Sequence, residues 1–335
     1  MCNLDNIIKA YHLAHRGKID DRDVIEFDKN KMYNIHSILE KLERKEWGSL
    51  FQYYRFKLYK PKERVVDALK LEGRIVQHVL CDNILRPYFE PRLIKENCAC
   101  RVGKGTHYAM NLVKQGMVKF LKTHKDGYCL KMDIKHYFPS IDRTILKSLL
   151  KNFPDTETRE FLFWIIDHCP DALGLPIGNQ TSQWFALYYL NKIDRIIKEK
   201  YRIKFYTRYM DDLIIIHEDK TYLLKLLAEL RKVAKEELHL EFNGKTQIIP
   251  LRKGISFLGW KFLFNKSAKK IYMRIDSSKK SFRNKAIKSI LKSFLLKEIT
   301  FNKYLSRIQS VIVNLKHGNT YLYRLTHIGI GFCFN

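Results

Sequence analysis

The sequence predicts an α+β fold in which helices back an antiparallel sheet and a helical region follows. Three observations lead to this prediction. Strand-like and helix-like hydrophobic periods follow one another in the order strand, helix, helix, strand, strand, helix and further strands. Two of these strands flank Tyr209 to Asp212 closely enough to form a hairpin, whose strands are antiparallel. Beyond Ser277 the period turns helical and the composition basic. The arrangement is related to the split βαβ motif.

The N-terminal part of the chain is expected to form short helices, followed by an extended segment. Apolar residues recur at helical spacing in several stretches before residue 60, and the pattern from Phe56 to Val66 is extended. The helical period returns from Ile75 to Leu85. This helix is expected to end before Pro87, because proline disfavours the helical conformation in the residue before it.

A glycine-rich segment, Gly103 to His107, has two readings of about equal weight. It is either a plain turn or a backbone loop that touches nucleic-acid phosphates. It lacks the spacing of a Walker motif.

A strand is expected at Tyr128 to Ile134, where apolar and polar residues alternate. Leu130 and Met132 share one face, whereas Lys131 and Asp133 share the other. Asp133 is therefore expected to point away from the apolar layer. The later elements are expected as a loop at 174–179, a helix at about 181–200, a hairpin around 209–212, a helix at 223–238 and strands at 255–264 and 271–275.

Composition favours a nucleic-acid partner. The chain has 335 residues and 40.0 kDa, with 62 Lys and Arg against 35 Asp and Glu, which gives a formal charge of +27 and a pI near 9.7. Such an excess makes a polyanion the expected partner. No signal peptide and no membrane span are predicted. The seven scattered cysteines include no CxxC pair, which argues against a disulfide framework or zinc site and favours a cytoplasmic protein.

Asp211 and Asp212 are the most informative residues of the chain. Adjacent carboxylates at the tip of an apolar hairpin repel each other, so they make sense mainly around a bound cation. Met-Asp also replaces the Asn-Gly or Asp-Gly that a tight hairpin prefers. If Asp133 meets this pair across the sheet, the cluster suits two Mg²⁺ ions, which support nucleotidyl transfer.

Five segments in order resemble the polymerase motifs of bacterial non-retroviral reverse transcriptases. They cover roughly residues 55 to 265, and an ordered set of this kind is highly specific. The segments are LKMDIKHYFPSID at Leu130–Asp142 (motif A), GLPIGNQTSQ at Gly174–Gln183 (motif B), YMDD at Tyr209–Asp212 (motif C), NGKT at Asn243–Thr246 (motif D) and FLGW at Phe257–Trp260 (motif E).

This resemblance implies a right-hand polymerase that acts as an RNA-directed DNA polymerase. Residues 1–55 would form an N-terminal helical extension, residues 56–270 the fingers and palm, and residues 271–335 a helical basic thumb. Asp133, Asp211 and Asp212 would hold two Mg²⁺ ions, with Asp212 acting more weakly than the other two.

The resemblance also implies roles for residues around the incoming nucleotide and the primer. Lys62 and Arg64 match residues that clamp the triphosphate, and Phe138 matches the gate that excludes a ribose 2′-hydroxyl. Lys245 matches a general acid for the pyrophosphate leaving group. Ile177 stands where the retroviral pattern has a glutamine, which implies looser base discrimination. Further nucleotide and primer contacts would come from Gln183 and from the primer grip Phe257, Leu258, Gly259 and Trp260.

The implied partners are a template RNA, an RNA/DNA duplex, deoxynucleoside triphosphates and a cognate noncoding RNA, with no membrane. Ile177 to Gln183 and Ala99 to His107 resemble diversity-generating retroelement enzymes, which work with a basic accessory protein. Phage-defence reverse transcriptases are a competing relative. Leu187-Tyr188-Tyr189 stands where retroelement enzymes usually have Asn-Ile-Tyr, and this departure weakens the resemblance to the retroelement enzymes. The sequence leaves open which applies and whether an accessory protein or self-association is required.

Two other functions use the same residues. A noncatalytic RNA-binding or maturase-like scaffold would keep the fold without chemistry, but all three aspartates are present. A metal nuclease would use the same carboxylates, but hydrolysis needs neither a sugar gate nor a primer grip.

Overall fold

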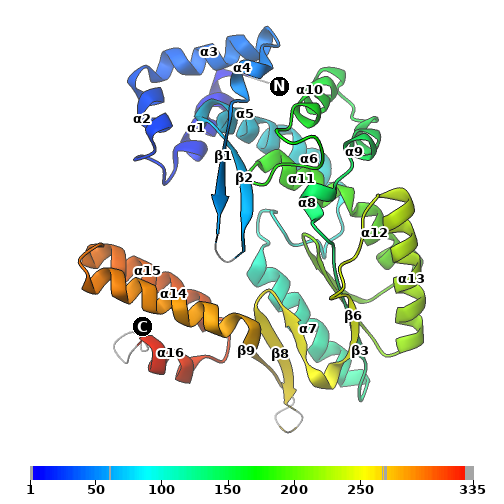
Figure 1. The fold of residues 1–335 in the computed structure, drawn as a ribbon. Coiled ribbons are helices and arrows are strands. Elements are labelled where there is room, and N and C mark those ends of the chain that lie inside the picture. The colour runs from blue at the N-terminus through cyan, green and yellow to red at the C-terminus, as the bar shows by residue number, and fades with distance from the viewer. Residues whose placement is uncertain (1–2, 60–61, 266, 268–269, 329–335) are drawn as a thin grey trace. The chain divides into compact units, whose positions relative to one another are not determined.

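The computed structural model describes residues 3–328 apart from 60–61, 266 and 268–269 (Figure 1). It confirms the predicted combination of helices and antiparallel sheets. The chain divides into two compact units, each built from three segments. The first unit comprises Met1–Cys100, Ile134–Lys200 and Ala228–Asn243, and the second comprises Arg101–Asp133, Tyr201–Leu227 and Gly244–Asn335.

The first unit begins with the predicted short helices. Asn3 caps the first of them by accepting a hydrogen bond from the Asn6 amide at 2.9 Å. Ile7, Ala10 and Tyr11 are buried along one face of this helix. The four helices are α1 (Leu4–His15), α2 (Arg22–Lys29), α3 (Lys31–Glu43) and α4 (Trp47–Leu50).

A two-stranded antiparallel hairpin follows, formed by β1 (Tyr53–Leu58) and β2 (Arg64–Leu69). Its register runs from Tyr53 opposite Leu69 to Leu58 opposite Arg64. In Figure 1 it extends as a two-stranded ribbon from the helices of the first unit. The extended pattern that the sequence predicts at 56–66 is part of this hairpin, although Lys60 and Pro61 lie outside the described residues.

Helical structure continues through Pro87, so the prediction that it ends before this proline is wrong. α5 (Leu71–Leu80) passes into a π-helical turn, η1 (Cys81–Leu85), and then into α6 (Arg86–Phe89) and the 3-10 turn η2 (Glu90–Arg92). Pro87 stands in the first turn of α6, where the missing N–H is tolerated. The π turn η1 ends directly before α6, so the regular α-helical hydrogen-bond pattern is interrupted just before this proline.

The remaining helices of the first unit surround a buried core. The single helix predicted at 181–200 is interrupted at Leu190, whose ψ of 5° departs from helical values. These helices are α8 (Tyr137–Ser140), α9 (Arg143–Leu150), α10 (Thr156–Asp167), α11 (Gln180–Tyr189), α12 (Asn191–Arg195) and the π turn η3 (Ile196–Lys200).

The boundary between the units falls within α13 (Lys220–Glu237).

The second unit contains a four-stranded antiparallel sheet in the order β4-β5-β3-β6. Gly116 of the helix α7 (Thr106–Thr123) lies against Phe205 and Ile216, so this helix covers one face of the sheet. The central strands are also buried on the opposite face, to which Leu130 and Met132 point, each at 0% exposure. The strands are β3 (Tyr128–Asp133), β4 (Phe205–Tyr209), β5 (Asp212–His217) and β6 (Gln247–Pro250).

A second, three-stranded sheet and the C-terminal helices complete this unit. The strand predicted at 255–264 is divided by a two-residue turn, Leu258-Gly259, in which both φ angles are positive, at 49° and 80°. Tyr304, Ile308 and Ile312 form the core between the helices. The elements are η4 (Leu251–Lys253), β7 (Ile255–Phe257), β8 (Trp260–Asn265), β9 (Lys270–Ile275), α14 (Ser277–Leu295), α15 (Phe301–Lys316) and α16 (Tyr321–Ile328).

None of the helices in the described part of the chain has the length and hydropathy of a membrane span. Five cysteines of this part of the chain are free thiols: Cys81, Cys98, Cys100, Cys129 and Cys169.

Candidate active site

The sheet of the second unit brings the predicted carboxylates together. Asp133 is the last residue of β3, Asp212 is the first residue of β5, and the two are direct partners in the antiparallel register. Side chains at directly opposite positions have Cβ atoms about 4.5–5.5 Å apart. Asp211 precedes Asp212 in the turn, so three acids gather at one end of the sheet.

The turn that carries Asp211 has an unusual backbone. Tyr209 pairs with Asp212, which leaves Met210 and Asp211 as a two-residue loop. Met210 has a φ of +56°, a conformation that non-glycine residues seldom adopt. Arg208 is fully buried beneath this turn, and its Nη1 donates a hydrogen bond to the Met210 carbonyl at 2.9 Å. This contact holds the turn in place.

Asp212 sits in an environment that favours its neutral form in the absence of a metal ion. Burial raises its pKa to about 7; the Lys131 ammonium acts in the opposite direction, and the neighbouring Asp133 and Asp211 add to the rise. Lys131 Nζ lies 4.0 Å from Asp212 Oδ1. Among the described residues, that buried oxygen has no hydrogen-bond partner.

These residues fit a hard divalent cation. In the described part of the chain, no three His, Cys, Asp or Glu side chains converge as a ready-made set of metal ligands. The buried carboxylate oxygen of Asp212 nevertheless lacks a donor, and Asp133 and Asp211 are only partly buried next to it. Carboxylate oxygens are the ligands that Mg²⁺ prefers, so the donor atoms of these three residues suit such an ion.

Lys131 also connects the four-stranded sheet to the three-stranded sheet of the same unit. Its Nζ donates a hydrogen bond to the Ser256 carbonyl at 2.8 Å, and Ser256 belongs to β7. The strand alternation gave a signal for this residue, because Lys131 shares the face of Asp133. Arg208, by contrast, carried no signal in the sequence.

The predicted primer-grip residues occupy the hairpin between β7 and β8. Phe257 and Trp260 are each 1% exposed and belong to the core, whereas Leu258 and Gly259 form the partly exposed turn. The Arg283 guanidinium lies 4.8 Å from the centre of the Trp260 ring. Only the turn of this motif is therefore available to a ligand.

Lys245 is exposed in the turn that leads into β6. β6 pairs with β3 up to Gln247 opposite Lys131, so the turn approaches the end of β3 that carries Asp133.

The predicted nucleotide-binding residues all belong to the first unit. Lys62 and Arg64 are exposed beside the turn of the β1–β2 hairpin, and Phe138 is half-buried in α8 rather than part of the core. The Ile177 carbonyl accepts a hydrogen bond from the Asp67 amide at 3.1 Å. Gln183 is half-buried on α11.

Comparison with known proteins identifies one matching family and several similar structures. Residues 57–262 match the sequence profile of the family described as Reverse transcriptase (RNA-dependent DNA polymerase). No curated protein sequence matches the chain. The apo telomerase of Candida tropicalis is similar in structure, with a TM-score of 0.51 and 14% identity over 72% of this chain and 53% of that chain. At this identity, the likeness bears on the fold alone.

Two further telomerase structures give lower scores. The apo telomerase of Candida tropicalis truncated from its C-terminal domain has a TM-score of 0.48 and 15% identity, over 68% of this chain and 55% of that chain. The telomerase of Candida albicans in complex with the TWJ fragment of telomeric RNA has a TM-score of 0.47 and 11% identity, over 74% and 51%. This chain thus spans about half the length of the telomerases that it matches.

Proposed function

The chain belongs to the reverse transcriptase (RNA-dependent DNA polymerase) family, and we propose that it copies a structured RNA template into cDNA by nucleotidyl transfer with two Mg²⁺ ions. The register of β3 and β5 carries this proposal, because it sets Asp133 opposite Asp212, next to Asp211. Asp133, Asp211 and Asp212 would hold the ions. Two such ions, when bound, stabilise the attacking and leaving oxygens of an in-line phosphoryl displacement.

Residues around the aspartates prepare them for this role. Arg208 supports the Met210 carbonyl and thereby keeps Asp211 at the tip of the hairpin. Lys131 provides the positive charge nearest to Asp212, which lowers the cost of ionising a buried carboxylate. Lys245, exposed near this end of β3, would donate a proton to the departing pyrophosphate.

The first unit supplies the residues proposed to bind the nucleotide. Lys62 and Arg64 are exposed, as residues that grip a triphosphate must be, and a guanidinium fork suits phosphate oxygens. Phe138 is half-exposed, so its ring can exclude a ribose 2′-hydroxyl. Gln183 and Ile177 would contact the nucleotide, and the apolar Ile177 side chain offers no hydrogen bond for base selection.

The C-terminal helices and the β7–β8 turn are proposed to hold the duplex. Leu258 and Gly259 would contact the primer, anchored by the buried Phe257 and Trp260. The formal charge of +27 favours binding to phosphates. In this proposal, residues 1–55 are an N-terminal extension, 56–270 the fingers and palm, and 271–335 the thumb. The positive charge proposed to contact the duplex in this region comes from five exposed lysines of α14: Lys279, Lys280, Lys285, Lys288 and Lys292.

The proposed setting is a bacterial retroelement or phage-defence system in which the enzyme copies a cognate noncoding RNA. The segments Ile177 to Gln183 and Ala99 to His107 support the retroelement, whereas Leu187-Tyr188-Tyr189 departs from the retroelement pattern. Sequencing the nucleic acid that copurifies from cells distinguishes them. A cDNA with substitutions at template adenines supports the retroelement, and a faithful copy of one structured RNA supports defence.

Primer extension tests the activity directly. The purified chain, given primed RNA, deoxynucleotides and Mg²⁺, is expected to extend the primer, and the double variant Asp211→Ala, Asp212→Ala is not. Asp126→Ala is the matched control, because Asp126 is an exposed aspartate just before β3 in the same unit. Extension by the double variant at the wild-type rate would refute the metal-binding assignment. RNA binding without extension by the wild type would favour a noncatalytic scaffold.

A further inference from the structure

We propose that Asp171 is a positioning residue for the incoming nucleotide, because its ion pair with Arg55 fixes the direction of the β1–β2 hairpin. The inference rests on the proposed polymerase function, in which Lys62 and Arg64 of that hairpin bind the triphosphate. All the residues that carry it lie in the first unit.

The hairpin depends on its base for orientation. Toward the turn its side chains are exposed on both faces: Phe56 is 39% exposed, Leu58 45% and Val65 39%. An isolated two-stranded hairpin is marginally stable in water. The positions of Lys62 and Arg64 are therefore set by contacts made farther down the strands, where Val66, Asp67 and Leu69 are buried.

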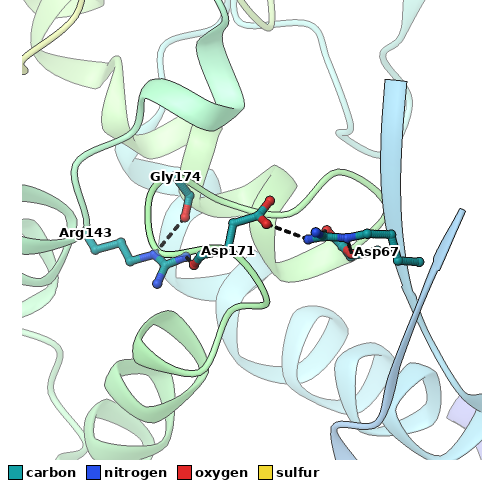
Figure 2. A network of polar contacts seen from close by, with 5 residues as sticks. Asp67, Arg143, Asp171 and Gly174 are labelled. Carbon is teal, nitrogen blue, oxygen red and sulfur yellow. Dashed lines mark hydrogen bonds and ion pairs between the residues drawn. The ribbon is translucent and has the colours of Figure 1, made fainter. Parts of the chain in front are cut away.

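Arg55 makes the central contact at this base. Its guanidinium binds the Asp67 carboxylate across the two strands, with Nε at 2.7 Å from Oδ1 and Nη2 at 3.1 Å from Oδ2. The same Nη2 donates to Asp171 Oδ1 at 2.6 Å. Asp67 is buried, and the side chain of Asp171 is 59% exposed. One guanidinium thus joins the hairpin to the loop that contains Asp171 (Figure 2).

That loop is itself held firmly. Arg143, at the start of α9, donates from Nε to the Gly174 carbonyl at 2.8 Å and from Nη2 to the Asp171 carbonyl (Figure 2). Gly174 has a φ of +70°, and a Cβ there would lie 2.5 Å from the backbone of Pro139. The Leu175 amide donates to the Phe138 carbonyl at 2.9 Å. These contacts therefore hold the loop in place against the segment that contains Phe138, the proposed sugar gate.

These contacts form a continuous path from the hairpin to Phe138. Arg55 and Asp171 connect the hairpin to the loop through side chains, and the Asp67 amide connects it to Ile177 through the backbone. A charge-assisted hydrogen bond between partly exposed groups contributes little to stability but fixes geometry. Loss of the Asp171 carboxylate is expected to loosen the hairpin without unfolding the unit.

The test uses Asp171→Asn in the full chain, with nucleotide titration in primer extension. The expected result is a rise of about two- to fivefold in KM for the deoxynucleotide, with kcat and the melting temperature unchanged. Asp171→Glu, which keeps the charge, is expected to restore a KM close to that of the wild type. Glu160→Gln is the matched control, because it breaks a comparably exposed ion pair of the same unit, Lys45–Glu160 at 3.3 Å, and should leave KM unchanged.

A failure of the Asp171 inference can be distinguished from a failure of the proposed polymerase function. If the wild type extends primers and Asp171→Asn has the wild-type KM, this inference is wrong while the proposed function stands. If the wild type incorporates no nucleotide under any condition that supports RNA binding, the proposed function is wrong and the inference falls with it. An equal rise in KM in Glu160→Gln would also overturn the role of Asp171.

Discussion

Asp133 and Asp212 are direct partners across the antiparallel strands β3 and β5. Two acids at opposite positions repel each other, and burial adds to the cost of ionising Asp212. The chain keeps this arrangement at one end of a well-packed sheet. The most direct physical use for such a pair is to bind a divalent cation.

The contribution of Asp212 to stability and the stabilisation by Mg²⁺ should depend on pH in opposite ways. The pKa of Asp212 is raised from 3.8 to about 7, so between these values the folded state binds a proton that the unfolded state has lost. Without metal, stability from this group therefore falls as pH rises through this window. Mg²⁺ requires the ionised carboxylate, so stabilisation by Mg²⁺ should grow as pH rises through 7.

Melting temperatures at pH 6, 7 and 8, with and without Mg²⁺, check this prediction. Asp212→Asn should remove most of the pH dependence of the Mg²⁺ effect. If Mg²⁺ raised the melting temperature equally at all three pH values, the predicted pH dependence would be contradicted.

Lys131→Met should destabilise the protein, because the Ser256 carbonyl loses a charged donor and Asp212 loses its nearest cation. The free energy of unfolding is expected to fall by about 1–3 kcal/mol. Urea denaturation measures this change, with Lys125→Met as the control, since Lys125 is an exposed lysine shortly before the same strand. Equal stabilities of the two variants would argue against a structural role for Lys131.

Phe138→Val should admit ribonucleotides. The half-buried ring is proposed to occupy the space of a 2′-hydroxyl, and a smaller side chain should reduce the preference for deoxynucleotides about tenfold or more. Single-nucleotide incorporation with matched dNTP and rNTP measures the ratio of kcat/KM. Retained dNTP incorporation by the variant is the control, and an unchanged ratio would exclude Phe138 as the gate.

Gly174→Ala should be far more damaging than Gly103→Ala. Both glycines have positive φ angles, 70° and 72°, but only at Gly174 would a Cβ meet backbone atoms at 2.5 Å. Around Gly103, nothing in the described chain lies within 4 Å of the position that a Cβ would take. The expected loss is about 1 kcal/mol at Gly103 and at least about 2 kcal/mol at Gly174. Comparable urea midpoints for the two variants would contradict the prediction that the close approach of residue 174 to the Pro139 backbone makes this substitution more destabilising.

Lysines of α14 should contribute to duplex binding through charge alone. Lys285→Gln and Lys288→Gln are each expected to reduce the slope of log K against log salt by about 0.9 for an RNA/DNA duplex. Titrations at several salt concentrations measure this slope. Lys9→Gln, an exposed lysine of α1, is the control. Slopes that match the wild type would exclude these lysines from the binding surface.

Much of the fold was accessible from local patterns. The alternation at 128–134 predicted that Lys131 and Asp133 share a face, and the structure agrees, with Leu130 and Met132 buried on the other. Local rules failed where packing overrides them. Helical winding continues past Pro87, the helix after motif B is interrupted at the buried Leu190, and a turn at Leu258-Gly259 divides a predicted strand.

The sequence by itself determined the strand and helix periods, the order of the motifs and the excess of positive charge, since each of these is a property of neighbouring residues or of composition. Only the tertiary structure decided that Asp133 faces Asp212, that Arg208 supports the Met210 carbonyl, and that Arg55 reaches Asp171, 116 residues away. Strand register and long-range ion pairs depend on how whole elements pack. A local pattern records which face a residue occupies, but it carries no information about the residue that lies opposite.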